Sequence, residues 1–159
     1  MGNTLSILNL PRTRCGARQS SKKRVFESAA AMIADDQAYL ESGEVFSALI
    51  SRERLGSTAM GNGIAIPHCR IANCAEPVGA LITLADPVDF DAHDGQGVDV
   101  VFVLLVPEDA HQEHLDVLAL LARMFSTPEN LIRLRAAEDD QALYQTATQI
   151  LGDLTTAPA

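Results

Sequence analysis

The feature of this 159-residue chain that restricts its fold most strongly is a short apolar segment between glycine and proline residues, which predicts a strand. Residues 61–68 are Gly-Asn-Gly-Ile-Ala-Ile-Pro-His. Consecutive apolar residues can be buried on both faces of a strand when helices cover both faces of its sheet. Because proline cannot donate a ladder hydrogen bond, we expect the strand to stop at Pro67 and to push His68 out at its end.

The rest of the chain predicts one helix-covered mixed sheet in a single domain. Ser20 or Ser21 can cap a first helix, and Ser42 opens a second. Apolar runs at 78–84 and 98–106 predict two strands, ended by Asp86-Pro87 and Pro107, and the turn between them is short enough to favour an antiparallel pair. Three more helices are expected to start near residues 109, 128 and 140. We expect residues 1–20 to be a basic, weakly ordered lead-in, 21–152 the domain and 153–159 a loose tail.

Charge and composition exclude some classes of function. The chain carries 12 basic and 21 acidic residues, a net charge of −9, which argues against a nucleic-acid binder. No apolar run approaches the roughly 20 residues of a membrane helix, so no membrane insertion is expected. Cys15, Cys69 and Cys74 form no even disulfide framework, which favours the cytoplasm.

Three kinds of chemistry can be argued from the reactive side chains. His111 and His114 share a helix face, but a zinc site needs more ligands than the sequence offers, and no metal is expected. Cys69 follows His68, yet neighbours on an extended chain point to opposite sides, which spoils a Cys-His nucleophilic pair. Phosphoryl transfer fits better, because it needs a nucleophile such as His68, a cation and hydrogen-bond donors.

The cation and the donors for such a site lie just before His68 in the chain. Arg52 or Arg54 could supply the cation, and the Ser57-Thr58 loop could bind oxygens through its hydroxyls and backbone N–H groups. The alternative interpretation of both arginines is compensation of the partial negative charge at a helix C-terminus.

The segments 51–58, Ser-Arg-Glu-Arg-Leu-Gly-Ser-Thr, and 61–68 together resemble the signature of phosphotransferase-system IIA domains of the fructose/mannitol class, closest to its nitrogen-regulatory branch. The resemblance runs from about residue 21 to 151. It implies a three-layer α/β/α sandwich with a mixed sheet. It also implies that His68 accepts a phosphoryl group, that His114 is a second active-site histidine and that Arg52 is the active-site arginine. Ser57, Thr58 and Asn62 occupy matching loop positions and are expected to bind phosphate.

The same resemblance implies a function without cofactor or metal. An HPr-type phosphocarrier protein would phosphorylate His68, and the two forms of the protein would bind different target proteins as a regulatory switch. Two alternatives stay open: a sugar-transport IIA component that passes phosphate to a IIB domain, and a binding module without phosphotransfer.

Overall fold

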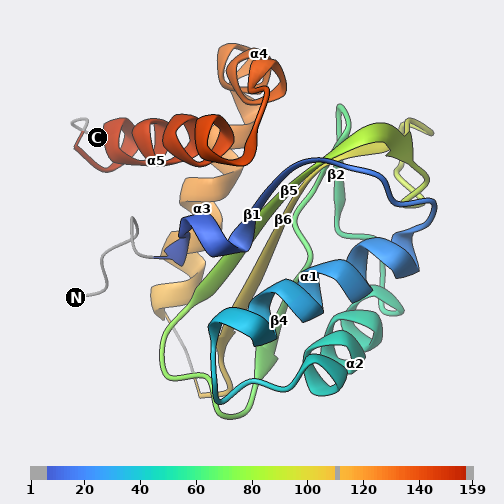
Figure 1. Cartoon of the computed structure of the whole chain (residues 1–159), viewed down its shortest axis with the longest axis vertical. Helices are drawn as coiled ribbons and strands as arrows, with labels where there is room; N and C mark the ends of the chain where they lie inside the picture. The colour runs from blue at the N-terminus through green and yellow to red at the C-terminus, as the bar shows by residue number, and fades with distance from the viewer. Residues whose placement is uncertain (1–6, 110–111, 157–159) are drawn as a thin grey trace.

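The computed structural model describes residues 7–109 and 112–156, without the side chains of residues 112–114 and 156. Within these ranges the chain forms one open mixed sheet flanked by five α-helices (Figure 1). The strands are β1 (Thr13–Ala17), β2 (Ala59–Gly61), β3 (Ile64–Ala65), β4 (His68–Ile71), β5 (Val78–Val88) and β6 (Val98–Pro107). The helices are η2 (Leu10–Arg12, a 3-10 turn), α1 (Lys22–Asp36), α2 (Ser42–Glu53), α3 (Gln112–Ser126), α4 (Pro128–Ala136) and α5 (Asp140–Thr156).

The sheet is built around β6. The strand order is β1-β5-β6-β3-β2, and β4 pairs with β6 beyond the end of β3. β5 and β6 are antiparallel, as the short turn between them predicts, whereas β1 is parallel to β5 and both β3 and β4 are parallel to β6. The predicted mixed sheet is therefore confirmed.

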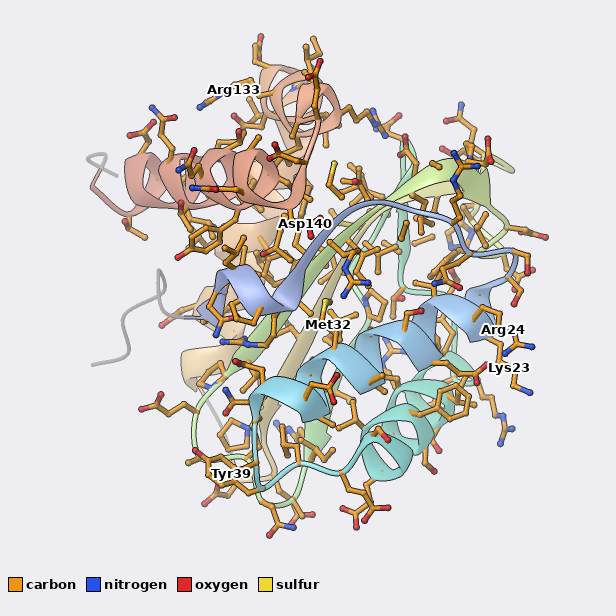
Figure 2. The ribbon with its side chains drawn as sticks, in the orientation of Figure 1. Lys23, Arg24, Met32, Tyr39, Arg133 and Asp140 are labelled. Atoms are coloured by element: carbon orange, nitrogen blue, oxygen red, sulfur yellow. The ribbon has the colours of Figure 1, made fainter. Side chains whose placement is uncertain are left out.

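Helices cover both faces of this sheet and confirm the three-layer sandwich. α1 and α2 lie over one face, while α3, α4 and α5 lie over the other (Figure 1). Ser21 caps α1 by accepting a hydrogen bond from the Arg24 amide, and the buried face of that helix carries Val25, Phe26, Ala29, Met32 and Ile33. Figure 2 shows Met32 directed from α1 toward the sheet. Each face of the sheet thus has its own apolar core.

The expectation of a weakly ordered lead-in is wrong for residues 7–17. Ile7 and Leu8 are buried, and β1 pairs with β5 as an edge strand. Arg12 is 4% exposed and donates from Nη1 to the carbonyls of Ile7 and Gly79, at 2.7 and 2.6 Å. Arg12, one of the basic residues that suggested a solvated segment, is therefore buried and links residues 7–12 to the sheet through its hydrogen bonds.

The free side of β1 is occupied by α5. The Cys15 amide donates to Asp140 Oδ1 at 2.7 Å, and Figure 2 shows Asp140 at the start of α5 beside β1. α5 also continues to Thr156, past the expected end of the domain at residue 152, and Leu154 packs against the core. The expected loose tail is therefore wrong for residues 153–156, and residues 157–159 lie outside the described ranges.

Of the three predicted proline stops, two agree with the structure, because β3 ends before Pro67 and β6 ends at Pro107, whereas the stop at Asp86-Pro87 is wrong. β5 runs through Pro87 to Val88, with a shift of register after Thr83. On the other side of β6, Ile64 lies opposite Val100 and His68 opposite Leu104, four residues farther along each strand. The Pro67 carbonyl still accepts a hydrogen bond from the Leu104 amide, so pairing resumes at once. His68 accordingly begins a new strand, β4, and is not pushed out beyond the end of one.

Candidate functional site

A pocket of about 190 Å³ opens where β4 meets α2 and α3. Arg52 comes from α2 in one helix layer and Leu118 from α3 in the other, so the pocket spans the edge of the sheet at β4. Its other lining residues are His68, Cys69, Arg70, Leu104 and Val106. The structure therefore brings the predicted His68 and Arg52 together in one pocket.

A backbone hydrogen bond fixes the tautomer of His68. Nδ1 lies 2.7 Å from the carbonyl oxygen of Ile66. Because a carbonyl oxygen can only accept, Nδ1 carries the proton, and Nε2 of the neutral ring keeps its lone pair. The half-buried imidazole thus offers Nε2 as a nucleophile from the wall of the pocket.

Arg52 lies in the last turn of α2 and is held by the loop that follows it. Its Nη1 donates to the Gly56 carbonyl at 3.1 Å. It also lies close enough to the Cys69 thiol to lower that group's pKa slightly, against a larger effect of burial. Arg52 therefore lies where it can compensate the partial negative charge at the C-terminus of α2, as in the alternative interpretation. It also lines the pocket beside His68.

Glu53, which follows Arg52, ties this loop to the protein. Its side chain is 5% exposed and accepts from the Thr58 hydroxyl at 2.8 Å, from the Thr58 amide, and from Lys22 Nζ at 3.1 Å. Burial lowers the pKa of Lys22, but its hydrogen bonds to Asp91 and Glu53 outweigh that effect and leave the pKa above its ordinary value. Lys22 balances the buried carboxylate, so the charge of Glu53 is already paired beside Arg52.

Ser57 and Thr58 are not among the residues that line the pocket. The Ser57 hydroxyl donates to the Phe90 carbonyl at 2.6 Å and accepts from the Ala59 amide, while the Thr58 hydroxyl is committed to Glu53. Both hydroxyls shape the loop next to Arg52. The structure does not place either as the phosphate ligand expected from the sequence.

Asn62 lies at the opposite end of the sheet from the pocket. It occupies the β2–β3 turn with φ 60°, its amide donates to Asp94, and its carbonyl accepts from Arg135. Asp99 lies beside this turn, and Leu104, the residue opposite His68, comes five residues later in β6. Five residues of a strand span about 15–20 Å, which separates the turn from His68. The glycines at 61 and 63 serve this tight turn, where a Cβ on Gly63 would lie 2.6 Å from Arg135 Nη2. Asn62 is therefore not brought to the site.

Cys69 is a packing residue. It packs against the core on the α1–α2 side, while Cys74 is buried. Burial raises the pKa of the Cys69 thiol to about 12, with a smaller contribution from Cys74. A thiol so reluctant to ionise is a poor nucleophile at neutral pH, which agrees with the argument against a Cys-His pair.

Arg70, which lines the pocket two residues after His68, was not predicted from the sequence as a site residue. The signal was present in the spacing, because residues i and i+2 of a strand share a face, but residues 68–71 were not recognised as a strand. His114 belongs to the first turn of α3, and its side chain and all of residue 111 lie outside the described part of the chain. Among the side chains that are described, no cluster of three or more metal-ligating residues occurs.

Known proteins resemble this chain over nearly its whole length. The family model described as "Phosphoenolpyruvate-dependent sugar phosphotransferase system, EIIA 2" matches residues 6–149. A nitrogen regulatory protein of Pseudomonas aeruginosa is 45% identical over 145 residues, 91% of this chain and 90% of that protein. One of Escherichia coli is 42% identical over 148 residues, 92% of this chain and 90% of that protein. The crystal structure of nitrogen regulatory protein IIA-Ntr from Neisseria meningitidis matches with a TM-score of 0.84 and 39% identity, over 92% of this chain and 97% of that one. Across the described residues no helix is both long and apolar enough to cross a bilayer.

Proposed function

Because this chain belongs to the EIIA 2 family of the phosphoenolpyruvate-dependent sugar phosphotransferase system, we propose that it is a phosphoryl carrier of the nitrogen-regulatory type that is loaded on His68. The donor is an HPr-type phosphocarrier protein, and the phosphorylated and free forms bind different target proteins in the cytoplasm. The observation that carries this proposal is the hydrogen bond from His68 Nδ1 to the Ile66 carbonyl in a pocket that Arg52 also lines.

The transfer exchanges one bond to phosphorus for another. The lone pair of His68 Nε2 attacks the phosphorus atom on the carrier as the bond between phosphorus and the carrier's side chain breaks, and the electrons of that bond stay with the carrier. Nδ1 keeps its proton and donates it in a hydrogen bond to the Ile66 carbonyl. This hydrogen bond stabilises the positive charge that develops on the ring. The phosphoryl group passes directly from the carrier to His68, and this step calls for no metal or cofactor.

The surroundings of His68 suit a phosphoryl group. A transferring phosphoryl spreads negative charge over its oxygens, and the Arg52 guanidinium can donate charge-assisted hydrogen bonds to them. Leu104, Val106 and Leu118 also line the pocket, and such apolar side chains strengthen these interactions where they exclude water. The Glu53–Thr58 contacts hold the loop that anchors Arg52.

His114 is proposed as the second histidine of this site. Leu118 lines the pocket and lies four residues later in α3, so position 114 shares that side of the helix. A histidine in the first turn also lies near the positive end of the helix, which suits an anion. Substitution His114→Ala should slow phosphoryl transfer without preventing folding. An unchanged transfer rate would remove His114 from the site.

The proposal is tested by incubating the protein with a phosphorylated HPr-type carrier and measuring its intact mass. We expect an acid-labile gain of one phosphoryl group, lost in His68→Ala and retained in His93→Ala, which changes an exposed histidine of the β5–β6 turn. Uptake by His68→Ala at the wild-type level would overturn the assignment.

The regulatory role needs a separate experiment. Phosphorylation adds up to about two negative charges at His68, which would repel acidic partners and attract basic ones. Captures with the phosphorylated and free forms should therefore yield different partners. Identical partners with both forms and with His68→Ala would favour a binding-only module. Transfer onward to a IIB domain would favour the sugar-transport alternative, which the family's description keeps open.

A further inference from the structure

Arg70 lies beside His68 on one face of β4. In the parallel pairing of β4 with β6, His68 is opposite Leu104 and Arg70 is opposite Val106. Leu104 and Val106 belong to the core on the α3 side, and all four residues line the pocket. Because side chains alternate along a strand, the His68 ring and the Arg70 side chain project from the same face, roughly 7 Å apart at the backbone.

The pocket is cationic in an acidic protein. Of its seven lining residues two are arginines and none is acidic, although the chain has 21 acidic and 12 basic residues. Arg52 uses one N–H on the Gly56 carbonyl. Arg70 is exposed, and its side chain makes no hydrogen bond or ion pair with another of the described residues, although its backbone pairs with β6. Its guanidinium is thus free to meet an anion in the pocket.

We infer that Arg70 is a second phosphoryl-binding residue, which donates to the oxygens of a group on His68 Nε2 from the β4 side while Arg52 donates from the α2 side. This inference rests on the proposed function. A phosphoryl group has three terminal oxygens, more than one planar guanidinium fork can satisfy, and two forks from different elements can share them. Arg70 therefore stabilises the phosphorylated form relative to the free form.

Two plainer roles would also place an arginine here. A charged residue on an edge strand prevents pairing with other chains, and an exposed arginine can help an acidic carrier to dock. Neither role alters the equilibrium between the free proteins, because that equilibrium depends only on the energies of the separated reactants and products. Preferential stabilisation of the phosphorylated protein by Arg70 does alter it.

The test is the equilibrium distribution of phosphoryl groups between the HPr-type carrier and this protein, measured by intact mass. We expect Arg70→Gln to shift the equilibrium about tenfold toward the carrier, and Arg70→Lys by less, since a lysine keeps the charge without the fork. The matched control is Arg54→Gln, which removes an exposed arginine at the end of α2 that does not line the pocket and should shift the equilibrium less than twofold.

The outcomes separate this inference from the proposed function. If the wild-type protein loads and Arg70→Gln behaves like Arg54→Gln, Arg70 does not bind the phosphoryl group. If Arg70→Gln changes the transfer rate but not the equilibrium, the docking role replaces the inference. If the wild-type protein does not load at all, the proposed function itself fails. In the wild type, the Arg70 side-chain Nε–H resonance should move on phosphorylation, and an unmoved resonance would contradict the contact even if a variant proved unstable.

Discussion

The Nδ1 atom of His68 lies 2.7 Å from the carbonyl oxygen of Ile66, two residues earlier in the chain. Pro67 lies between them, and its ring restricts the backbone at the point where this bond forms. One backbone group thereby sets which nitrogen of the imidazole is protonated. The chemistry of the pocket follows from that choice, because Nε2 is left as the nucleophile beside Arg52.

Replacement of Arg52 should slow the loading of His68. Arg52→Ala removes a charge-assisted donor to the transferring group, and we expect a loss of about 100-fold in the rate of phosphoryl uptake. Arg52→Lys should recover part of that rate. Arg54→Ala serves as the control, because Arg54 is exposed and lies outside the pocket lining. Equal rates for Arg52→Ala and Arg54→Ala in a quenched-flow measurement would contradict this role.

Glu53→Gln should weaken both the fold and the site. The substitution removes the charge that Lys22 pairs with and disturbs the acceptor of the Thr58 hydroxyl. We expect the free energy of unfolding, measured in urea, to fall by about 1–3 kcal/mol. The loosened loop should also lower the transfer rate, because the Gly56 carbonyl no longer holds Arg52 in one place. Glu44→Gln changes an exposed residue in the first turn of the same helix and should do neither. A Glu53→Gln protein as stable as Glu44→Gln would show the contacts to be unimportant.

The sequence predicted the elements whose signals are local. Ser21 and the apolar spacing of α1, the Thr127-Pro128 start of α4 and the antiparallel β5–β6 pair follow from capping, periodicity and turn length. β1 was missed because Arg12 looks like a solvated residue, and its burial depends on carbonyls of Ile7 and of Gly79, the latter 67 residues away. Such a contact cannot be seen in local spacing.

The site was predicted in part for a similar reason. His68 and Arg52 are 16 residues apart in sequence but line one pocket because β4 and α2 lie side by side. Asn62 was misassigned, because a glycine-rich segment with positive φ suits both an anion-binding loop and a tight turn, and here it is the turn. Arg70 escaped notice because β4 is short and carries polar residues that hide its alternation.

Stability toward acid should depend on Asp36. Burial acts to raise the pKa of this carboxyl, but hydrogen bonds from Gln37, Asn9 and Arg12 outweigh it and leave the pKa below its ordinary value of 3.8. A lowered pKa in the folded state means that the contribution is present above the pKa of the unfolded chain, and is lost as pH falls below about 4. Thermal melts between pH 7 and pH 3 measure this loss.

The Asp36 account has a matched control in its neighbour. Asp36→Asn leaves the buried Arg12 without its counter-charge, so we expect the free energy of unfolding at pH 7 to fall by about 2–4 kcal/mol. We also expect the stability of this variant to fall less steeply between pH 7 and pH 3, the acid limb of its pH profile. Asp35→Asn changes an exposed residue of the same helix and should leave both unchanged. An acid limb that Asp36→Asn does not flatten would rule out this carboxylate as its source.

Cys69 should be dispensable for phosphoryl uptake. With a pKa of about 12 in the folded protein, the thiol should react with iodoacetamide at pH 8 far more slowly than the same cysteine in the urea-unfolded chain. Cys69→Ala should still take up a phosphoryl group at close to the wild-type rate. Loss of uptake in this variant, with its fold intact by circular dichroism, would revive a Cys-His pair.

The most direct test of the account is a long-range ¹H–¹⁵N NMR spectrum of the His68 ring before and after loading by a phosphorylated HPr-type carrier. We predict a protonated Nδ1 and an unprotonated Nε2 in the free protein, and phosphorus bonded to Nε2 with Nδ1 still protonated after loading. Phosphorus on Nδ1, or on any residue other than His68, would contradict it.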